Sequence, residues 1–183
     1  CRPARPAPDL VVLQTGRLRG NVYPTGVRGE FPLQHYPFLA GYVKAVRAEA
    51  ERSGQEVLLV DLGDSLTGSF AAHVTRGQNM AALFNALGYD AVALGNLDAD
   101  LPPEVIPALR ATVLCPFEQP DGSPSMPGTA PAARFAKGRY AVTLHSNFYG
   151  DTPVEAYPLR FPSVYGPDRA PARPIRDHAA RAR

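Results

Sequence analysis

The sequence predicts an α/β fold built on a partial sheet of mostly parallel strands with flanking helices, and with irregular N- and C-terminal extensions. Short runs of β-branched and other apolar residues fit strands that are buried on both faces. Between these runs, apolar residues recur at three- and four-residue steps, as they do along one face of a helix. An alternation of strand, helix, strand and helix is typical of a parallel sheet.

Four strands and three helices are predicted in the first part of the chain. The strands are expected at residues 10–15, 56–62, 91–94 and 112–115, and the helices at residues 37–53, 78–87 and 103–110. The first helix should stop at Gly54 and the second at Gly88, because glycine readily adopts the left-handed backbone that follows many helices. Residues 10–115 are therefore the regular part of the predicted sheet.

Beyond residue 115 the pattern weakens. Residues 119–124 contain turn-forming residues, 125–134 look like a loop, 140–145 fit a fifth strand, and 154–161 fit an edge strand. Prolines disfavour regular structure near the C-terminus. We therefore expect a linker at residues 1–9, one domain at 10–165, and an extended tail rich in Pro and Arg at 166–183.

Composition and charge exclude several classes of protein. Of the 183 residues, 45% are hydrophobic and 20% are charged, so the chain can bury a core and is not wholly disordered. No stretch approaches the roughly 20 apolar residues that a membrane-spanning helix needs. The formal net charge is +2 and the arginines cluster only in the tail, so we expect no nucleic-acid partner.

The first residue, Cys1, stands before a stretch rich in Arg and Pro. This beginning resembles that of mature bacterial lipoproteins, in which a signal peptide is removed just before a cysteine that carries acyl chains. The resemblance implies a covalent lipid on Cys1 that anchors the protein to a membrane, at the periplasmic or outer face of the cell envelope. The alternative is a chain boundary that falls at a cysteine by coincidence. The other cysteine, Cys115, ends an apolar run and is expected to be buried.

Distinctive polar and glycine-rich segments follow the first three predicted strands. They read TGRLRGN at residues 15–21, DLGDSLTGS at 61–69 and LGNLD at 94–98. Ligands of parallel sheets bind at the carboxyl ends of the strands, where these segments would lie. In order and spacing, the segments resemble the metallophosphoesterase domain of the 5′-nucleotidase family, one of the calcineurin-like phosphoesterases. Over about residues 10–125, the resemblance implies a degenerate and truncated N-terminal domain of that kind.

Members of that family carry Asp-x-His-Gly after the first strand, Gly-Asp after the second and Gly-Asn-His-Glu after the third, all gathered around two metal ions. Carried over by position, Asp64 falls on the aspartate that bridges the metals, and Asn96 on the asparagine that completes a metal shell. The other positions differ: Arg17 and Arg19 replace the first Asp and His, Leu97 replaces the second His, and Asp98 replaces the Glu. The resemblance thus implies a vestigial metal site at Asp64, Asn96 and Asp98.

Two arginines at ligand positions argue against a bound metal. A guanidinium group keeps its charge, offers no lone pair to a metal and repels divalent ions. We expect Arg17 or Arg19 to form a charge-assisted pair with Asp64 where the metal would have been. Alternatively, the two arginines form an anion site that holds phosphate without cleaving it. Asp64 also fits an ordinary turn position after a glycine.

These expectations favour a protein that binds over one that hydrolyses. We expect a non-catalytic metallophosphoesterase-like lipoprotein that serves as a structural or accessory subunit of a membrane protein complex, with residues 166–183 contacting the other subunits. No cofactor is expected besides the lipid on Cys1. One alternative is a phosphoesterase or 5′-nucleotidase that holds a divalent metal at the vestigial site. Another is a phosphate or nucleotide sensor that uses Arg17 and Arg19.

Overall fold

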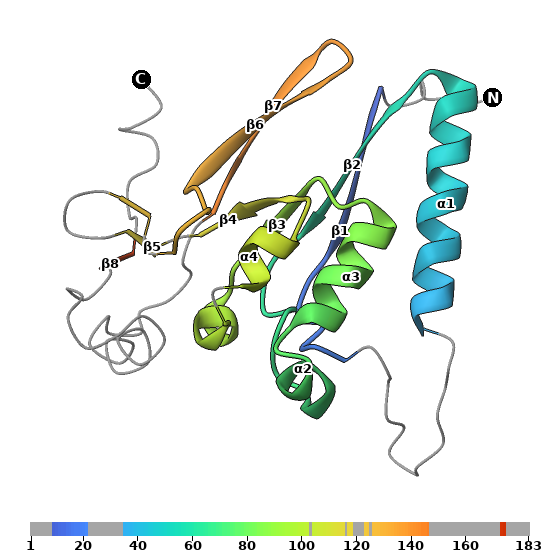
Figure 1. Cartoon of the computed structure of the whole chain (residues 1–183). Coiled ribbons are helices and arrows are strands. Elements are labelled where there is room, and N and C mark those ends of the chain that lie inside the picture. The colour runs from blue at the N-terminus through green and yellow to red at the C-terminus, as the bar shows by residue number, and fades with distance from the viewer. Residues whose placement is uncertain are drawn as a thin grey trace.

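The computed structural model describes residues 9–21, 35–102, 104–115, 117–118, 123–124, 126–146 and 173–174 of the chain. Its centre is a four-stranded parallel sheet in which the strands follow their order in the sequence, which confirms the predicted fold class (Figure 1). The strands are β1 (Leu10–Thr15), β2 (Glu56–Asp61), β3 (Ala91–Ala93) and β4 (Thr112–Leu114). Each of them falls within a predicted run.

Helices connect successive strands, as predicted. They are α1 (His35–Ser53) between β1 and β2, α3 (Gln78–Leu87) between β2 and β3, and α4 (Val105–Ala108) between β3 and β4. Two short helices were not predicted: α2 (Phe70–Val74) follows β2, and the 3-10 helix η1 (Asn96–Asp100) follows β3. Since the strands add in one direction and such crossovers are right-handed, the connecting helices lie on one face of the sheet.

The ends of α1 and α3 are fixed by backbone geometry and by one arginine. Gly54 and Gly88 have left-handed φ values of 68° and 67°, as the sequence predicts for residues that end a helix. Arg47 of α1 reaches the end of α3, where its Nη1 donates to the carbonyl of Leu87 at 2.6 Å and its Nη2 to that of Gly88 at 2.7 Å. Because the last carbonyls of a helix have no partner within it, these bonds join α1 to α3.

Two apolar layers cover the two faces of the sheet. On the helix face, side chains of α1, α3 and α4 pack against the sheet, and Phe84 and Tyr89 place their rings 4.5 Å apart at the centre. On the other face, a smaller cluster of Leu58, Val60, Ala91 and Leu114 packs against an antiparallel hairpin. Cys115 is 1% exposed and belongs to the larger layer, which confirms its predicted burial.

The hairpin consists of β6 (Ala132–Lys137) and β7 (Tyr140–His145), which pair with each other and not with the parallel sheet. The strand predicted at 140–145 is thus confirmed, but the loop predicted at 125–134 is wrong for its last residues, which begin β6. Three alanines in β6 weakened its strand signal, although Phe135 of this strand packs on the sheet. Lys137 also donates from Nζ to Asp90 at 2.8 Å, which joins the hairpin to the parallel sheet.

Several predictions concern residues outside the described part of the chain. These are Cys1, the edge strand at 154–161 and all of the 166–183 tail except Arg173–Pro174. Those two residues form β8 and pair antiparallel with β5 (Phe117–Glu118). Among the described residues, no helix is long and apolar enough to cross a membrane.

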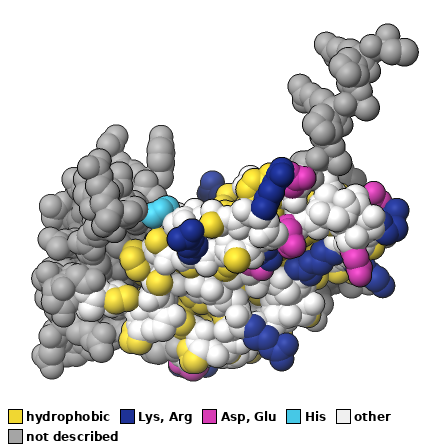
Figure 2. Space-filling model, turned by 90° about the horizontal axis from the view of Figure 1, so that it is seen from above, with side chains coloured by type: hydrophobic (Ala, Val, Ile, Leu, Met, Phe, Trp, Pro, Cys, Tyr) yellow, Lys and Arg dark blue, Asp and Glu magenta, His cyan; other side chains and the backbone are white. Residues whose placement is uncertain are grey.

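The end of the molecule at which the parallel strands begin carries both signs of charge. Figure 2 views this end, and acidic and basic side chains are interspersed across it without a continuous basic area. Two ion pairs, Lys137 with Asp90 and Arg139 with Asp9, contribute to this mixture. The segments predicted to form a site lie at the opposite end of the strands.

Candidate functional site

The three segments predicted from the sequence meet at the carboxyl edge of the sheet. The segment after β1 runs beside the segment after β2, and their backbones are joined by hydrogen bonds. Three amides donate to three consecutive carbonyls: Arg17 to Gly63 at 2.8 Å, Arg19 to Asp64 at 3.0 Å and Gly20 to Ser65 at 2.8 Å. The amide of Leu18 donates to the Ser65 hydroxyl at 3.1 Å. The order of the strands in the sequence therefore predicted correctly that these segments meet.

Asp98 joins the segments after β2 and β3 from inside the protein. Its side chain is fully buried, and Oδ2 accepts the amides of Asp64 at 2.8 Å and Gly95 at 3.0 Å. Oδ1 accepts the amide of Leu66 at 3.0 Å. Burial raises the pKa of Asp98 to about 6, while the backbone hydrogen bonds act in the opposite direction. Both carboxylate oxygens are thus bound to the protein backbone.

Asp64 is half-buried and stands in a left-handed conformation, with φ of 55°. Its Oδ1 accepts the amide of Leu97 at 2.9 Å, which is a second bond between the segments after β2 and β3. This contact depends on the missing side chain of Gly95, because a Cβ there would lie 2.1 Å from Asp64 Oδ1. Asn96 follows as the first residue of η1 and is half-buried. The retained aspartate therefore already has a structural partner.

The predicted ion pair between an arginine and Asp64 is not formed. Ion pairs in the described ranges involve Arg52, Arg76, Lys137 and Arg139, and include neither Arg17 nor Arg19. Both of these arginines are exposed, and both have left-handed backbones, with φ of 56° and 52°. Their amides bind the neighbouring segment, and their side chains are open to solvent. Two exposed positive side chains consequently stand where the resemblance had implied metal ligands.

Sequence reasoning missed a buried polar group beneath this edge. Asp61, 1% exposed, accepts the hydroxyl of Thr15 at 2.6 Å, the hydroxyl of Ser65 at 3.0 Å and the amide of Gly63 at 2.9 Å. Burial raises the pKa of Asp61, and it raises that of Tyr89, whose hydroxyl lies 2.8 Å from Thr15, to about 12. The position of Asp61 at the end of an apolar strand could have indicated such a group, because a carboxylate buried there needs hydrogen-bond partners.

The described residues do not fit a pair of divalent metals. No three His, Cys, Asp or Glu side chains in this part of the chain gather closely enough to hold a metal ion. Asp98 has both oxygens bound to backbone amides, and Asp64 has one. Of the other positions implied by the resemblance, Asn96 keeps an amide oxygen, whereas Arg17, Arg19 and Leu97 are cationic or apolar and are not metal ligands.

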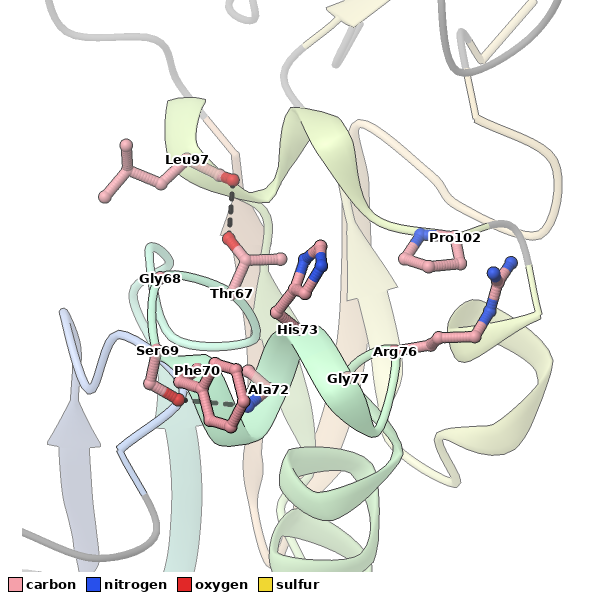
Figure 3. Close-up of a pocket in the computed structure, with 10 residues that line it drawn as sticks. All are labelled: Thr67, Gly68, Ser69, Phe70, Ala72, His73, Arg76, Gly77, Leu97 and Pro102. Atoms are coloured by element: carbon pink, nitrogen blue, oxygen red, sulfur yellow. Dashed lines mark hydrogen bonds between the residues drawn. The ribbon is translucent and has the colours of Figure 1, made fainter.

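A pocket of about 530 Å³ opens beside these segments, between α2 and η1 (Figure 3). Thr67 closes its inner side by donating from Oγ1 to the carbonyl of Leu97 at 2.6 Å. Phe70 lies at the rim and is 82% exposed. Arg76 also lines the pocket, but its guanidinium is bound to Glu104. The pocket therefore combines apolar surface with polar side chains, among them the imidazole of His73 (Figure 3).

The first prediction concerns the pH dependence of stability. Because burial raises the pKa of Asp98 to about 6, the folded state holds this proton more tightly than the unfolded state does. The free energy of unfolding should therefore fall as pH rises from about 4 to about 6, by up to about 3 kcal/mol from this group. Urea unfolding at several pH values should show a smaller fall in Asp98→Asn. Parallel pH profiles for the two proteins would contradict the assignment.

The second prediction tests the close approach of Gly95 and Asp64. Gly95→Ala should lower the free energy of unfolding by about 1–3 kcal/mol, because its Cβ would displace the Asp64 carboxylate. Gly41→Ala is the matched control: no atom lies within 4 Å of its added Cβ, and it should stabilise α1 by about 0.5–1 kcal/mol. Equal effects of the two substitutions in urea unfolding would count against a packing role for Gly95.

Comparisons with known proteins agree with this fold. No family model matches the chain. A stretch of 52 residues, 28% of the chain, is 44% identical to a 5′-nucleotidase of Bos taurus and spans 9% of that protein. The sulfate thiohydrolase SoxB of Thermus thermophilus aligns with 94% of the chain and 40% of its own, at TM-score 0.69 and 18% identity.

Two solved nucleotidases give similar results. A 5′-nucleotidase precursor of Thermus thermophilus aligns over 81% of this chain and 33% of its own, at TM-score 0.59 and 22% identity. The NAD nucleotidase of Haemophilus influenzae aligns over 73% and 28%, at TM-score 0.58 and 18% identity. The resemblance predicted from the motifs is thus confirmed as a likeness of fold. The chain has the metallophosphoesterase-like fold of the 5′-nucleotidases and SoxB, and it spans less than half the length of those solved structures.

Proposed function

We propose that this chain is a non-hydrolytic metallophosphoesterase-like domain that acts by binding, as an accessory part of a larger assembly. The observation that carries the proposal is the bonding of Asp98: its two carboxylate oxygens accept hydrogen bonds from three backbone amides inside the protein. The Asp98 carboxylate therefore stabilises the fold by joining the segments after β2 and β3. Arg17 and Arg19 then leave the adjacent segment with positive charge and no metal ligand.

The repulsion between an arginine and a divalent metal ion can be estimated from Coulomb's law. One unit charge about 4 Å from a divalent cation costs on the order of 8 kcal/mol at an effective dielectric constant near 20. That repulsion would act on any ion held near Asp64 if Arg17 stood at the ligand position that the resemblance gives it. A metal-dependent hydrolase of this fold would need metal ligands other than those that the described residues supply.

The third prediction tests hydrolysis and metal binding together. Calorimetric titration with Mn²⁺ and with Zn²⁺, followed by metal analysis after gel filtration, should show no stoichiometric ion on the purified chain. Hydrolysis of p-nitrophenyl phosphate and of AMP in the presence of Mn²⁺ should equal that of Asp64→Ala. Two bound equivalents of metal, or an activity that Asp64→Ala abolishes, would establish the alternative of a phosphoesterase with an atypical site.

Anion binding at Arg17 and Arg19 is a second candidate function. Both guanidinium groups are exposed, they form none of the ion pairs among the described residues, and their backbones are fixed on the segment after β2. An arginine presents a fork of N–H donors that matches the oxygens of a phosphate. Two such groups on one fixed segment favour a phosphate or nucleotide sensor over an unliganded loop.

The fourth prediction is therefore a phosphate affinity. Calorimetry with inorganic phosphate and with AMP should give saturable binding that weakens at least tenfold in the double variant Arg17→Ala, Arg19→Ala. Arg52→Ala is the matched control, because it removes an exposed arginine of α1 that pairs with Glu49. If the unaltered protein gives no heat above dilution, or if Arg52→Ala weakens binding equally, the two arginines are not an anion site.

The cellular setting belongs to the same proposal. A lipid on Cys1, a place at the outer or periplasmic face of the cell envelope, and subunit contacts through residues 166–183 stay predictions from the sequence. They are consistent with a domain whose role is to bind partners, because a tethered arm can become ordered on a neighbouring subunit.

A further inference from the structure

The pocket between α2 and η1 is lined by side chains of two kinds, and these lie at different ends. Phe70, His73 and Arg76 follow one another at three-residue steps along α2 and just after it, and all three line the pocket. In Figure 3, Phe70 and Arg76 stand at opposite ends of the pocket and His73 stands between them. The pocket therefore has an aromatic end and an end that carries hydrogen-bond donors.

The aromatic end leaves a large apolar side chain in contact with water. Phe70 is 82% exposed, and covering such a ring with another apolar group is favourable. Leu97 of η1 also lines the pocket, and it stands where the family resemblance implies a histidine. This chain thus has apolar surface at a position that the resemblance would make polar.

The other end of the pocket offers hydrogen-bond donors. An arginine side chain only donates, and the imidazole of the exposed His73 can donate as well. Nε and Nη2 of Arg76 both lie 2.6 Å from Oε1 of Glu104, which holds the guanidinium in place. The described residues that line the pocket include no Asp or Glu. A ligand group at this end must therefore accept hydrogen bonds, and a negatively charged acceptor is favoured.

Hydrogen bonds fix the walls of the pocket before any ligand enters. Ser69 accepts the amide of Ala72 at 3.0 Å and donates to the carbonyl of Gly20 at 2.5 Å, which ties the start of α2 to the segment after β1. The bond from Thr67 to the carbonyl of Leu97 ties the segment before α2 to η1. The volume of about 530 Å³ is typical of pockets that hold small organic molecules. Binding to such a preformed pocket orders little of the protein.

From these observations we propose that the pocket binds a small aromatic carboxylic acid. The ring of the ligand lies against Phe70 and Leu97, and its carboxylate accepts hydrogen bonds from His73 and Arg76. This site goes beyond the proposed function, because Arg17 and Arg19 are not among the described residues that line the pocket.

Binding of 2-naphthoate is the fifth prediction. In a titration of the ¹⁵N-labelled chain, the amide signals of residues 68–77 should shift saturably, while those of α1 should not. The size of the probe suggests a dissociation constant on the order of 1 mM or tighter. The absence of saturable shifts at residues 68–77 would overturn the proposal.

Three further probes separate the contribution of the ring from that of the charge. The uncharged 2-naphthamide keeps the ring and should bind at least about fivefold more weakly than 2-naphthoate. The cation 2-naphthylmethylammonium would place a donor against a donor and should not bind. Acetate keeps the carboxylate without a ring and should not bind either. Equal affinities of the three naphthyl probes would contradict a site that selects an acid.

Substitutions at exposed positions assign the two ends of the pocket. Phe70→Ala should weaken binding of 2-naphthoate at least about fivefold. His73→Ala should weaken binding of 2-naphthoate more than that of 2-naphthamide, because it removes a donor to the carboxylate. Phe38→Ala is the matched control for Phe70, since it removes a 66% exposed aromatic of α1 and should leave binding unchanged. Thermal unfolding of each variant should match that of the unaltered chain.

Two outcomes of these substitutions would overturn the proposal. Equal losses in Phe70→Ala and Phe38→Ala would show that the probe adheres to any exposed aromatic side chain. Loss of binding in the double variant Arg17→Ala, Arg19→Ala without loss in Phe70→Ala would assign the probe to the anion site.

Discussion

The buried carboxylate of Asp98 is the interaction on which the carboxyl edge of the sheet depends. An ionised group without water must be compensated by hydrogen bonds, and three backbone amides from two loops provide them. These bonds fix the positions of Asp64, Leu66 and Gly95 at once. The shape of the candidate site therefore follows from one side chain that points away from solvent.

This arrangement decides what the edge can do chemically. Asp64, the residue that the family resemblance would assign to a metal, is drawn toward η1 by the amide of Leu97. Gly95 makes that approach possible because it has no side chain. Arg17 and Arg19 then supply the exposed charge of the first segment. The proposed function follows from this arrangement, because exposed arginines and internally bound carboxylates favour an anion or a partner at this edge over two metal ions.

Much of the fold could be predicted because its signals are local. Apolar runs located β1 to β4, and Gly54 and Gly88 located the ends of two helices. The position of the site followed from topology, since loops after parallel strands must meet at one edge. Strand β6 was missed because its alanines carry little hydrophobic signal, and its burial depends on a sheet formed by distant residues.

Side-chain partners were predicted less well than elements, for a physical reason. The ion pair expected between Arg17 or Arg19 and Asp64 would have kept the Asp64 carboxylate from being buried without a partner. Instead, backbone amides bind the carboxylates, because they are fixed in place and lose little freedom on binding. Asp61 follows this preference only in part, because it accepts the backbone amide of Gly63 but also the side-chain hydroxyls of Thr15 and Ser65, which come from two different segments.

The most direct measurement is a crystal structure of the chain soaked in MnCl₂, with data collected at the manganese absorption edge. The role assigned to Asp98 predicts no anomalous peak at Asp64 or Asn96, and carboxylate oxygens that stay bonded to the amides of Asp64, Leu66 and Gly95. A pair of strong peaks beside Asp64, with Asp98 turned toward them, would contradict it.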